Sequence, residues 1–364
     1  MASVNEPPED VLIDILSRLP ARSILRFKSV SKRWYSLVQN PIFISLHRTH
    51  ARFFYCVSQE RTVDHNPWSM HLLPDQTSIH DLDLSFTRPH LGKDFSHQGS
   101  CNGLMCLSLN SNIVICNPAT REFRLLPQPP CHSWHTNYLG FAFDSKTNDY
   151  KVVRVATLRE TRCVDYRIHI YCMSADSWEE LFLMALSHNL DGYHHHPCTS
   201  KDGVFYWLTS YVHPRDRIDV LNTVEGSFKR RSLPIDVGSD SQINLCLLND
   251  SLVLIVSLYN SRLGETQFDV WLMDELGDQE CWTKKCSIGP ISGSPISGSQ
   301  RAFGFQPNNE VFMTGCDNGL IVSYNHSTGD TKKYKQLCNL PELRCLRQVF
   351  QYSESLVSVK RRLD

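Results

Sequence analysis

The feature that most constrains the fold of this 364-residue chain is a layout that recurs five times. In each copy an alternating apolar run leads into a polar turn and then into a second run that contains an aromatic residue. The copies are NIVICNPATREFRLLP (112–127), IHIYCMSADSWEEL (168–181), IDVLNTVEGSFKRRSLP (218–234), FDVWLMDELGDQECWTKK (268–285) and LIVSYNHSTGDTKKYK (320–335). Their central residues are spaced by 55, 50, 50 and 53 positions. This pattern predicts five β-hairpins at a nearly constant period.

A second hairpin-like pair precedes each copy. The pairs are CNGLMCLSLNSNIVICNP, which shares a strand with the first copy, GFAFDSKTNDYKVVRV, SKDGVFYWLTS, LCLLNDSLVLIVS and FGFQPNNEVFMTG. Two hairpins in about 50 residues make a four-stranded propeller blade, close to the kelch period. The double glycine of kelch repeats is absent, so we do not expect true kelch repeats.

Both ends of this region supply a further blade. Residues 51–73 and 346–360 can combine into a closing sixth blade, which would remove the exposed strand edges of an open ring. We therefore predict an all-β domain over residues 51–364, a β-propeller of about six blades. An open β-sandwich, or a pair of them, is the alternative.

Residues 1–50 follow a helical period instead. In PEDVLIDILSRL, Val11, Leu12, Ile15, Leu16 and Leu19 recur at steps of three and four, which predicts an apolar helix face. ARSILRFK and KRWYSLVQN predict two more helices, the second capped by Ser29 or Ser31, and the apolar pattern continues past Pro41. So small an all-α domain needs a partner or a neighbouring domain to cover its apolar surface.

The bulk numbers exclude several classes. Apolar residues are 41% and charged residues 21%, which suits a chain that buries a core. The net charge of −1 indicates no nucleic-acid partner, and no apolar run is long enough to span a membrane. MASVNEPPED has no charged start followed by an apolar run, so we expect no secretory signal, a cytoplasmic and/or nuclear location, and reduced thiols among the 14 cysteines.

PPEDVLIDILSRLPARSILRFKSVSKRWYSLVQNPIFISLH resembles the F-box of plant proteins, matching the family pattern from Pro8 through Leu46. Pro7 stands where the family usually has Leu, and Asn40 replaces the common Asp before Pro41. The resemblance implies docking onto the Skp-type adaptor of SCF ubiquitin ligases and, through it, onto cullin. The resemblance also implies which residues would form or support this interface. They are Pro8, Leu12, Ile15, Leu16, Leu19, Pro20, Leu25, Val30, Ser31, Lys32 and Trp34.

Five basic side chains border this segment: Arg22, Arg26, Lys28, Lys32 and Arg33. They could steer an acidic partner. They could equally form a plain solvated face.

The β region is similar to the F-box-associated domain of plant F-box proteins, which includes the S-locus F-box group. GSCNGLMCL, CNPATREFRLLP, GFAFDSKTNDYKVVRV, SWEEL and GVFYWL carry this resemblance. It implies that the β domain recruits a protein for ubiquitination. If the chain is a member of the S-locus group, the expected target is an S-locus ribonuclease. For other members of the family the target would be a different protein.

The chain carries no recognisable catalytic motif. GxGxxG, GxxxxGK[ST] and GxSxG are absent, so no phosphate cradle or nucleophile elbow is encoded in the usual way. The best metal candidate, YHHHPC (193–198), lacks a second ligand pair nearby and is better interpreted as a loop. Asn117-Pro118-Ala119-Thr120 and the segment Asp144–Asp149 are predicted tight turns. We expect no catalytic residue, metal or cofactor.

Aromatic, His and Arg side chains gather in the longer segments between predicted strands: Trp68, His132, Trp134, His135, Tyr193, His194, His195, His196, Tyr211, Tyr259 and Arg262. Loops on a rigid scaffold are where recognition concentrates. The pattern does not say which of these loops share one face, and the target-binding residues stay unassigned.

Our first hypothesis is a non-catalytic substrate receptor of an SCF-type ubiquitin ligase. The alternative is a β-propeller binding protein or enzyme whose N-terminal helices merely cap it. A third is a scaffold that binds the adaptor without directing ubiquitination.

Overall fold

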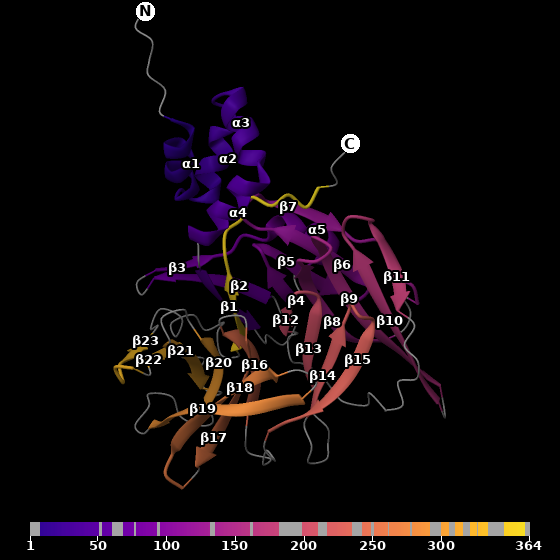
Figure 1. Ribbon diagram of the computed structural model, residues 1–364, viewed down its shortest axis with the longest axis vertical. Coiled ribbons are helices and arrows are strands. Elements are labelled where there is room, and N and C mark those ends of the chain that lie inside the picture. Colours follow the sequence, from indigo (N-terminus) through magenta and orange to yellow (C-terminus); the bar gives the residue numbers. More distant parts are fainter. Residues whose placement is uncertain are drawn as a thin grey trace, which may run out of the picture.

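A computed structural model gives the structure of the chain (Figure 1). The residues that it describes are 8–50, 53–59, 68–75, 78–92, 95–131, 135–160, 163–181, 199–209, 217–234, 242–248, 251–260, 262–276, 279–291, 300–305, 310–315, 321–325, 327–333 and 346–360. Several residues singled out in the sequence lie outside these ranges: Pro7, His132, Trp134, Tyr193, His194, His195, His196 and Tyr211. In the described part of the chain, no helix has the length and apolarity needed to cross a lipid bilayer.

Four helices come first: α1 (Glu9–Ser17), α2 (Ala21–Phe27), α3 (Lys32–Gln39) and α4 (Pro41–His50). Prolines set three of the boundaries. Pro8 and Pro20 precede α1 and α2 in extended conformation, and Pro41 begins α4. Ser31 caps α3 by accepting a hydrogen bond from the Trp34 amide (3.2 Å). It is one of the two caps that the sequence predicted for this helix.

Six four-stranded antiparallel sheets follow, one for each blade. From the first strand to the fourth, blade 1 is β24 (Leu346–Tyr352), β1 (Phe53–Gln59), β2 (Trp68–Asp75) and β3 (Ser78–Asp81). Blade 2 is β4 (Ser96–Cys101), β5 (Leu104–Leu109), β6 (Asn112–Asn117) and β7 (Glu122–Leu125). Blade 3 is β8 (His135–Asp144), β9 (Asp149–Glu160), β10 (Cys163–Cys172) and β11 (Ser177–Leu181).

Blade 4 is β12 (Thr199–Lys201), β13 (Val204–Thr209), β14 (Arg217–Asn222) and β15 (Ser227–Ser232). Blade 5 is β16 (Gln242–Leu248), β17 (Ser251–Asn260), β18 (Glu265–Leu276) and β19 (Gln279–Ile291). Blade 6 is β20 (Gln300–Phe305), β21 (Glu310–Gly315), β22 (Ile321–Asn325) and β23 (Thr331–Lys333). A 3-10 helix, η1 (Ser85–Thr87), and a short helix, α5 (Arg88–Leu91), lie between blades 1 and 2.

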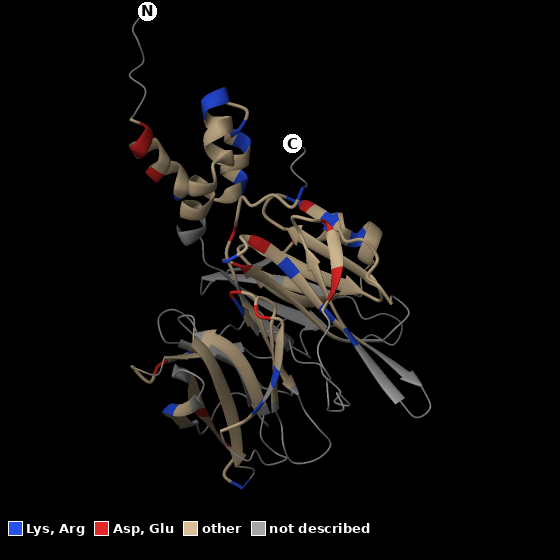
Figure 2. Cartoon of the chain, turned by 45° about the vertical axis from the view of Figure 1, so that its right-hand side comes forward, with Lys and Arg blue, Asp and Glu red and all other residues tan. Residues whose placement is uncertain are grey.

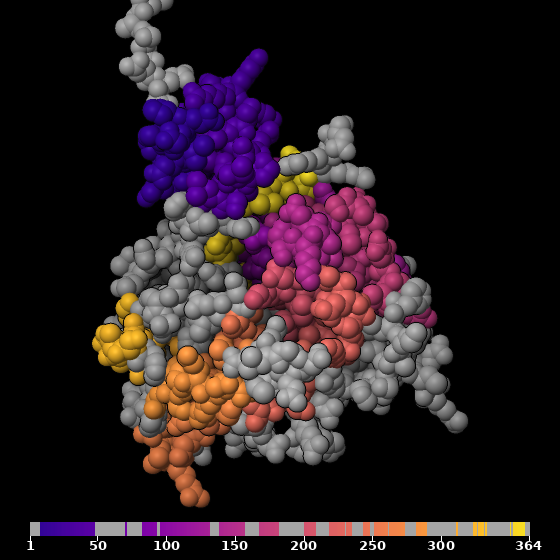
Figure 3. All heavy atoms as spheres, in the orientation of Figure 1, coloured from indigo at the N-terminus to yellow at the C-terminus, as the bar shows by residue number. Residues whose placement is uncertain are grey.

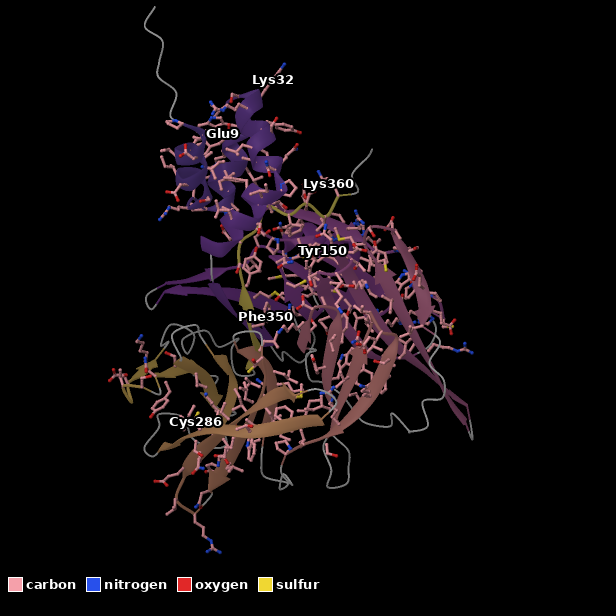
Figure 4. The ribbon with its side chains drawn as sticks, viewed as in Figure 1. Glu9, Lys32, Tyr150, Cys286, Phe350 and Lys360 are labelled. Atoms are coloured by element: carbon pink, nitrogen blue, oxygen red, sulfur yellow. The ribbon has the colours of Figure 1, made fainter. Side chains whose placement is uncertain are left out.

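The blades form a closed ring. The first strands β24, β4, β8, β12, β16 and β20 contact one another in succession all the way round. Blade 1 closes the ring because β24, from the end of the chain, pairs antiparallel with β1, with Phe53 opposite Tyr352. On the blade 2 side, His97 of β4 stacks on Phe350 of β24, with ring centroids 3.8 Å apart (Figure 4). The prediction of a six-bladed propeller with a blade built from both ends is confirmed, and the β-sandwich alternative is wrong.

The closing blade differs from its prediction at two points. Its fourth strand, β3, lies beyond residue 73, where the expected segment ended. Strand β24 ends at Tyr352, so residues 353–360 are no part of the sheet. These eight residues follow an irregular path between the helices and blade 2 (Figure 1).

Hydrophobic clusters between neighbouring blades supply the core. Tyr171 and Val152 of blade 3 pack with Ile115 of blade 2, and Phe205 of blade 4 packs with Val153 of blade 3. These side chains are almost wholly buried. Both faces of a middle strand are covered in this way, which explains why several strands have continuous apolar runs instead of alternation.

Side chains at the strand ends shape the turns. The Asn117 Oδ1 atom accepts hydrogen bonds from the amides of Ala119 (2.9 Å) and Thr120 (3.3 Å), which makes the predicted turn. The Thr120 hydroxyl takes no part in this turn, because its buried Oγ1 has no partner among the described residues. Asp144 builds its predicted turn in the same way as Asn117, by accepting from the amides of Lys146 and Thr147.

Seven cysteines are free thiols: Cys101, Cys106, Cys116, Cys131, Cys172, Cys246 and Cys286. Cys106 and Cys116 are fully buried, and burial raises the pKa of both thiols. They pack as small apolar side chains, as expected.

A buried ion pair in blade 3 gives a test of the fold. Lys151 Nζ lies 2.6 Å from Asp144 Oδ2, and both side chains are buried. We expect Lys151→Met to lower the free energy of unfolding by about 3–5 kcal/mol at pH 7, because it leaves a buried carboxylate without its cation. Lys146→Met, at an exposed position of the same turn, should change it by about 0.5 kcal/mol or less. Urea unfolding measures both.

The same pair sets a pH dependence. Burial alone would raise the pKa of Asp144, but the hydrogen bonds from Lys151 and Thr147 outweigh it, and the pKa lies below its usual value. The stabilisation is therefore complete at neutral pH and is lost as the pH falls through the folded-state pKa. The penalty of Lys151→Met should shrink in acid, where Asp144 can take up a proton. An equal penalty at pH 7 and pH 3 would contradict this account.

Candidate functional site

The N-terminal helices (residues 8–50, here the helical module) carry more apolar surface than their own core uses. Leu12 and Leu16 of α1 point into a core shared with Ile24, Val38 and Phe43. On the same helix Val11 and Ile15 stay 43% and 51% exposed. The single apolar face that the sequence indicated is thus two faces, one packed inward and one left for a contact outside the module.

Other apolar side chains of the module are also exposed. Val30 at the α2–α3 turn is 62% exposed, Tyr35 of α3 is 50% exposed, and Ile42 of α4 is 79% exposed. In so small a domain, this much exposed apolar surface is typical of an interaction site. Val11, Tyr35 and Ile42 were not among the predicted interface residues, although the step of four from Val11 to Ile15 is visible in the sequence.

The eleven predicted interface residues divide by burial. Exposed are Pro8, Ile15, Pro20, Val30, Ser31 and Lys32; half-buried are Leu19, Leu25 and Trp34; buried are Leu12 and Leu16. The Trp34 ring packs edge-on against Phe27, with centroids 5.4 Å apart. The exposed group is placed to touch a partner, while Leu12 and Leu16 are placed only to support the helix that presents it.

Charge is distributed unevenly over the module. Glu9 and Asp10 begin α1, whereas the predicted basic side chains lie on α2, α3 and the turn between them (Figure 2). Arg22, Arg26 and Lys32 are exposed, and Arg33 lies 3.8 Å from Glu9 in a salt bridge that joins α3 to α1. Arg22, Arg26 and Lys32 leave their charge facing solvent, where an acidic partner would meet it.

The propeller has two faces, and the topology assigns each turn to one of them. Every blade is an antiparallel meander whose first strand lies innermost and whose fourth strand lies outermost. Strands at the same position in different blades therefore run in the same direction. Turns between first and second strands, and between third and fourth strands, therefore lie on one face. Turns between second and third strands, and the connections between blades, lie on the other.

The helical module sits on the first of these faces, which we call the module face. Ala119, in the turn between the third and fourth strands of blade 2, packs into the core of the module. The tips of the β9–β10 and β17–β18 hairpins point away from the module, on the opposite or distal face (Figure 1), and Figure 3 shows the same for the β17–β18 tip.

Four of the loop residues singled out in the sequence lie in the described part of the chain, and these four belong to the distal face. Tyr259 and Arg262 lie at the β17–β18 turn, which joins a second strand to a third. Trp68 begins β2, a third strand, and His135 begins β8, a first strand, so both lie at the distal ends of their strands.

The β17–β18 turn is firmly built. The Asn260 Oδ1 atom accepts from the amides of Arg262 (3.1 Å) and Leu263 (3.3 Å), and the Gly264 amide donates to the Asn260 carbonyl (2.8 Å). Leu263 is presented at the tip with 67% of its surface exposed. A fixed backbone that displays an exposed apolar side chain loses little conformational freedom when a partner binds it.

Metal chemistry finds no support in the described part of the chain, where no three His, Cys, Asp or Glu residues gather as ligands would. YHHHPC (193–198) lies outside the described residues.

Fold and site together define a closed six-bladed β-propeller that carries a four-helix docking module on one face. The chain belongs to the F-box-associated β-propeller family: the family model "F-box associated beta propeller domain" matches residues 63–359. The F-box domain model matches residues 8–46. Both resemblances drawn from the sequence are confirmed.

The similar proteins are plant F-box proteins. An F-box/kelch-repeat protein of Arabidopsis thaliana is 24% identical over 79% of this chain and 72% of its own length. F-box protein CPR1 of Arabidopsis thaliana is 27% identical over 77% of this chain and 72% of its own. Among solved structures, the Dos1 propeller matches 77% of this chain and 68% of its own, with 13% identity and a TM-score of 0.38, too low to bear on function. F-box, propeller and relatives together support the general role of an SCF substrate receptor.

Two neighbouring residues of α1 test the division between core and surface. Leu16 is 2% exposed. Changing it to Ala should lower the free energy of unfolding of the module by about 2–5 kcal/mol, because the change leaves a cavity in the core. Ile15→Ala, one position away, should cost about 0.5 kcal/mol or less. Hydrogen exchange of α1–α3 amides in the full chain measures both. Equal protection in the two variants would contradict the assignment of Leu16 to the core.

Proposed function

We propose that this chain is a non-catalytic substrate receptor that docks on a Skp-type adaptor through the exposed face of its F-box and holds a target protein on the distal face of its propeller. The observation that carries the proposal is the second apolar face of α1. Val11 and Ile15 remain exposed although Leu12 and Leu16 already fill the core. An adaptor that covers Ile15 and Val30 would bury that surface, and the basic side chains of α2 and α3 would meet acidic groups on it.

The mechanism is tethering. A target held by the propeller and a conjugating enzyme held through adaptor and cullin become parts of one complex, so the reaction between them is effectively intramolecular. This mechanism requires two binding surfaces and no catalytic group in the chain. It also requires that the two surfaces do not overlap, and the module and distal faces meet that condition.

The distal face is the part of the propeller that we assign to the target. The module face is partly occupied by the F-box, whereas the second-to-third-strand turns and the connections between blades extend away from it. Leu263 and Arg262, at the fixed β17–β18 turn, are the exposed described residues that we propose contribute to target binding.

Adaptor binding by the full chain is the direct test. Wild type should bind a purified plant Skp-type adaptor in isothermal titration calorimetry. Ile15→Asp should weaken binding by about 2 kcal/mol or more, roughly 30-fold, because it forces a carboxylate into the interface. Leu263→Asp is the matched control: it also replaces an exposed apolar residue with Asp, but on the distal face. It should bind the adaptor like wild type.

Two results would count against the docking proposal. A folded wild type that does not bind any plant Skp-type adaptor would overturn the receptor role. Normal binding by both Ile15→Asp and Val30→Asp would place the interface elsewhere on the F-box.

The reciprocal experiment tests the distal face. Proteins that co-purify with the wild-type chain from plant extract, and that accumulate when the proteasome is inhibited, are quantified by mass spectrometry. Leu263→Asp should reduce their recovery at least several-fold, since a charge is placed where an apolar contact is proposed. Ile15→Asp should retain them, as should Val224→Asp, at a 37% exposed position on the module face. Loss with Val224→Asp but not Leu263→Asp would reverse the assignment of faces.

A further inference from the structure

The last described residues of the chain, Ser353–Lys360, form a strap that lies between the F-box and blade 2. The strap leaves the ring at Tyr352, the end of β24, and runs along the module face to Lys360 (Figure 4). In the space-filling view its atoms lie against those of the helices on one side and of blade 2 on the other (Figure 3). Ser355, Leu356 and Val359 are buried, so the strap is packed into the protein and not laid over it.

Blade 2 holds the strap by its backbone. The Asn117 Nδ2 atom donates to the carbonyl oxygens of Ser355 (2.9 Å) and Val357 (2.7 Å), and the Arg124 Nε atom donates to that of Val359 (2.7 Å). Glu122 accepts from the Ser358 hydroxyl (2.7 Å) and the Val359 amide (3.3 Å). These bonds satisfy backbone groups of a segment that has no sheet partner.

The other side of the strap belongs to the F-box. Leu356 is part of the hydrophobic core formed by Leu12, Leu16, Ile24 and Phe43. The Ala21 amide, at the first position of α2, donates to the Glu354 carboxylate (3.0 Å). Since Pro20 offers α2 no side-chain cap, a residue 333 positions away satisfies this free amide.

One glycine of blade 2 leaves the room that the strap needs. Gly103, in the turn between β4 and β5, has φ +78°, and a Cβ atom placed there would lie 2.2 Å from Ser355 Cβ and 2.6 Å from the Ser353 carbonyl oxygen. Any other residue at position 103 would push the strap away from the blade. Gly264, with a similar φ of +65°, has no atom within 4 Å of the same Cβ position.

The strap supplies two of the contacts between the F-box and the propeller that the structure describes. Among the described helices and strands, none of α1–α4 packs extensively against a strand. The described contacts include those of Ala119, Glu354 and Leu356. Domains of one chain move relative to each other unless their interface is large and hydrophobic, so loss of the two strap contacts should loosen the F-box.

We propose that the strap is a strut that fixes the orientation of the F-box relative to the distal face, and that Glu354, Leu356 and Gly103 are its positioning residues. The proposal rests on the receptor function proposed above. In a ligase that works by tethering, this orientation decides which lysines come within reach of the conjugating enzyme. The strut therefore selects the site of ubiquitin transfer without touching the target or the conjugating enzyme.

Distance measurement in the isolated full chain tests the strut directly. Spin labels on noncanonical amino acids at the exposed positions Ser36 of α3 and Lys146 of blade 3 report the separation of F-box and propeller. Wild type should give one narrow distance distribution, and Gly103→Ala and Leu356→Ala should broaden it at least twofold. Gly264→Ala, which carries similar backbone strain without the collision, should match wild type. Equal distributions for Gly103→Ala and Gly264→Ala would overturn the strut.

Glu354 provides variants with little risk of misfolding, because its side chain is only partly buried. Glu354→Ala should speed hydrogen exchange at the Ala21 amide at least tenfold and leave β5 and β9 protected as in wild type. Glu354→Gln, which keeps an acceptor oxygen, should restore most of the protection. Unchanged exchange in Glu354→Ala would contradict the coupling of the strap to α2.

A reconstituted ligase tests the functional consequence. The measurement is which of the propeller's own lysines receive ubiquitin. Gly103→Ala, which lies in blade 2 outside the F-box, should bind the adaptor within about twofold of wild type, yet spread the modified lysines over more positions. An unchanged lysine pattern despite a broadened distance distribution would overturn the positioning role. The distance and exchange measurements need no adaptor. Failure of adaptor binding would therefore reject the proposed function, while these two measurements would still test the strut.

Discussion

The pairing of β1 with β24 is the contact on which the remaining architecture depends. It joins residues near 55 to residues near 350 in one sheet, so the ring cannot close until almost the whole chain is in place. Such a pairing carries a large loop-closure cost, which the packing of blade 1 against blades 2 and 6 has to offset. Its geometric effect is as important: Phe53 and Tyr352 are opposite each other, so the chain enters and leaves the ring at one point of the module face.

That common point explains how the F-box is held. The helices lead into β1 where the strap leaves β24, and the strap can therefore reach the core of the F-box within four residues of Tyr352. Leu356 completes a core that the helices begin, and Glu354 supplies a helix cap that the local sequence lacks. The two domains are distinct in fold but share a small hydrophobic core, and the end of the chain contributes to both.

Much of this could be predicted from residue patterns. Alternating runs and Asn- or Asp-led turns indicated the hairpins, the 50-residue period indicated blades, and apolar steps of three and four with a Ser31 cap indicated helices. These signals are local, since a strand pattern or a cap depends on residues a few positions apart. The interface prediction was less selective. Leu12 and Ile15 look alike in the sequence, and only the packing of α1 on the other helices separates the core residue from the exposed one.

The sequence by itself determined the two domain types, the number and order of the hairpins and the placement of a docking module before a propeller, because each depends on periodicity and turn chemistry. Only the tertiary structure decided which loops share the distal face, because that depends on the common direction of strands in separate blades. Only it decided the role of residues 353–360, whose irregular backbone has no periodic signal. Their partners Asn117, Ala21 and Gly103 lie more than 200 positions away, and contacts at that separation exist only once the ring has closed.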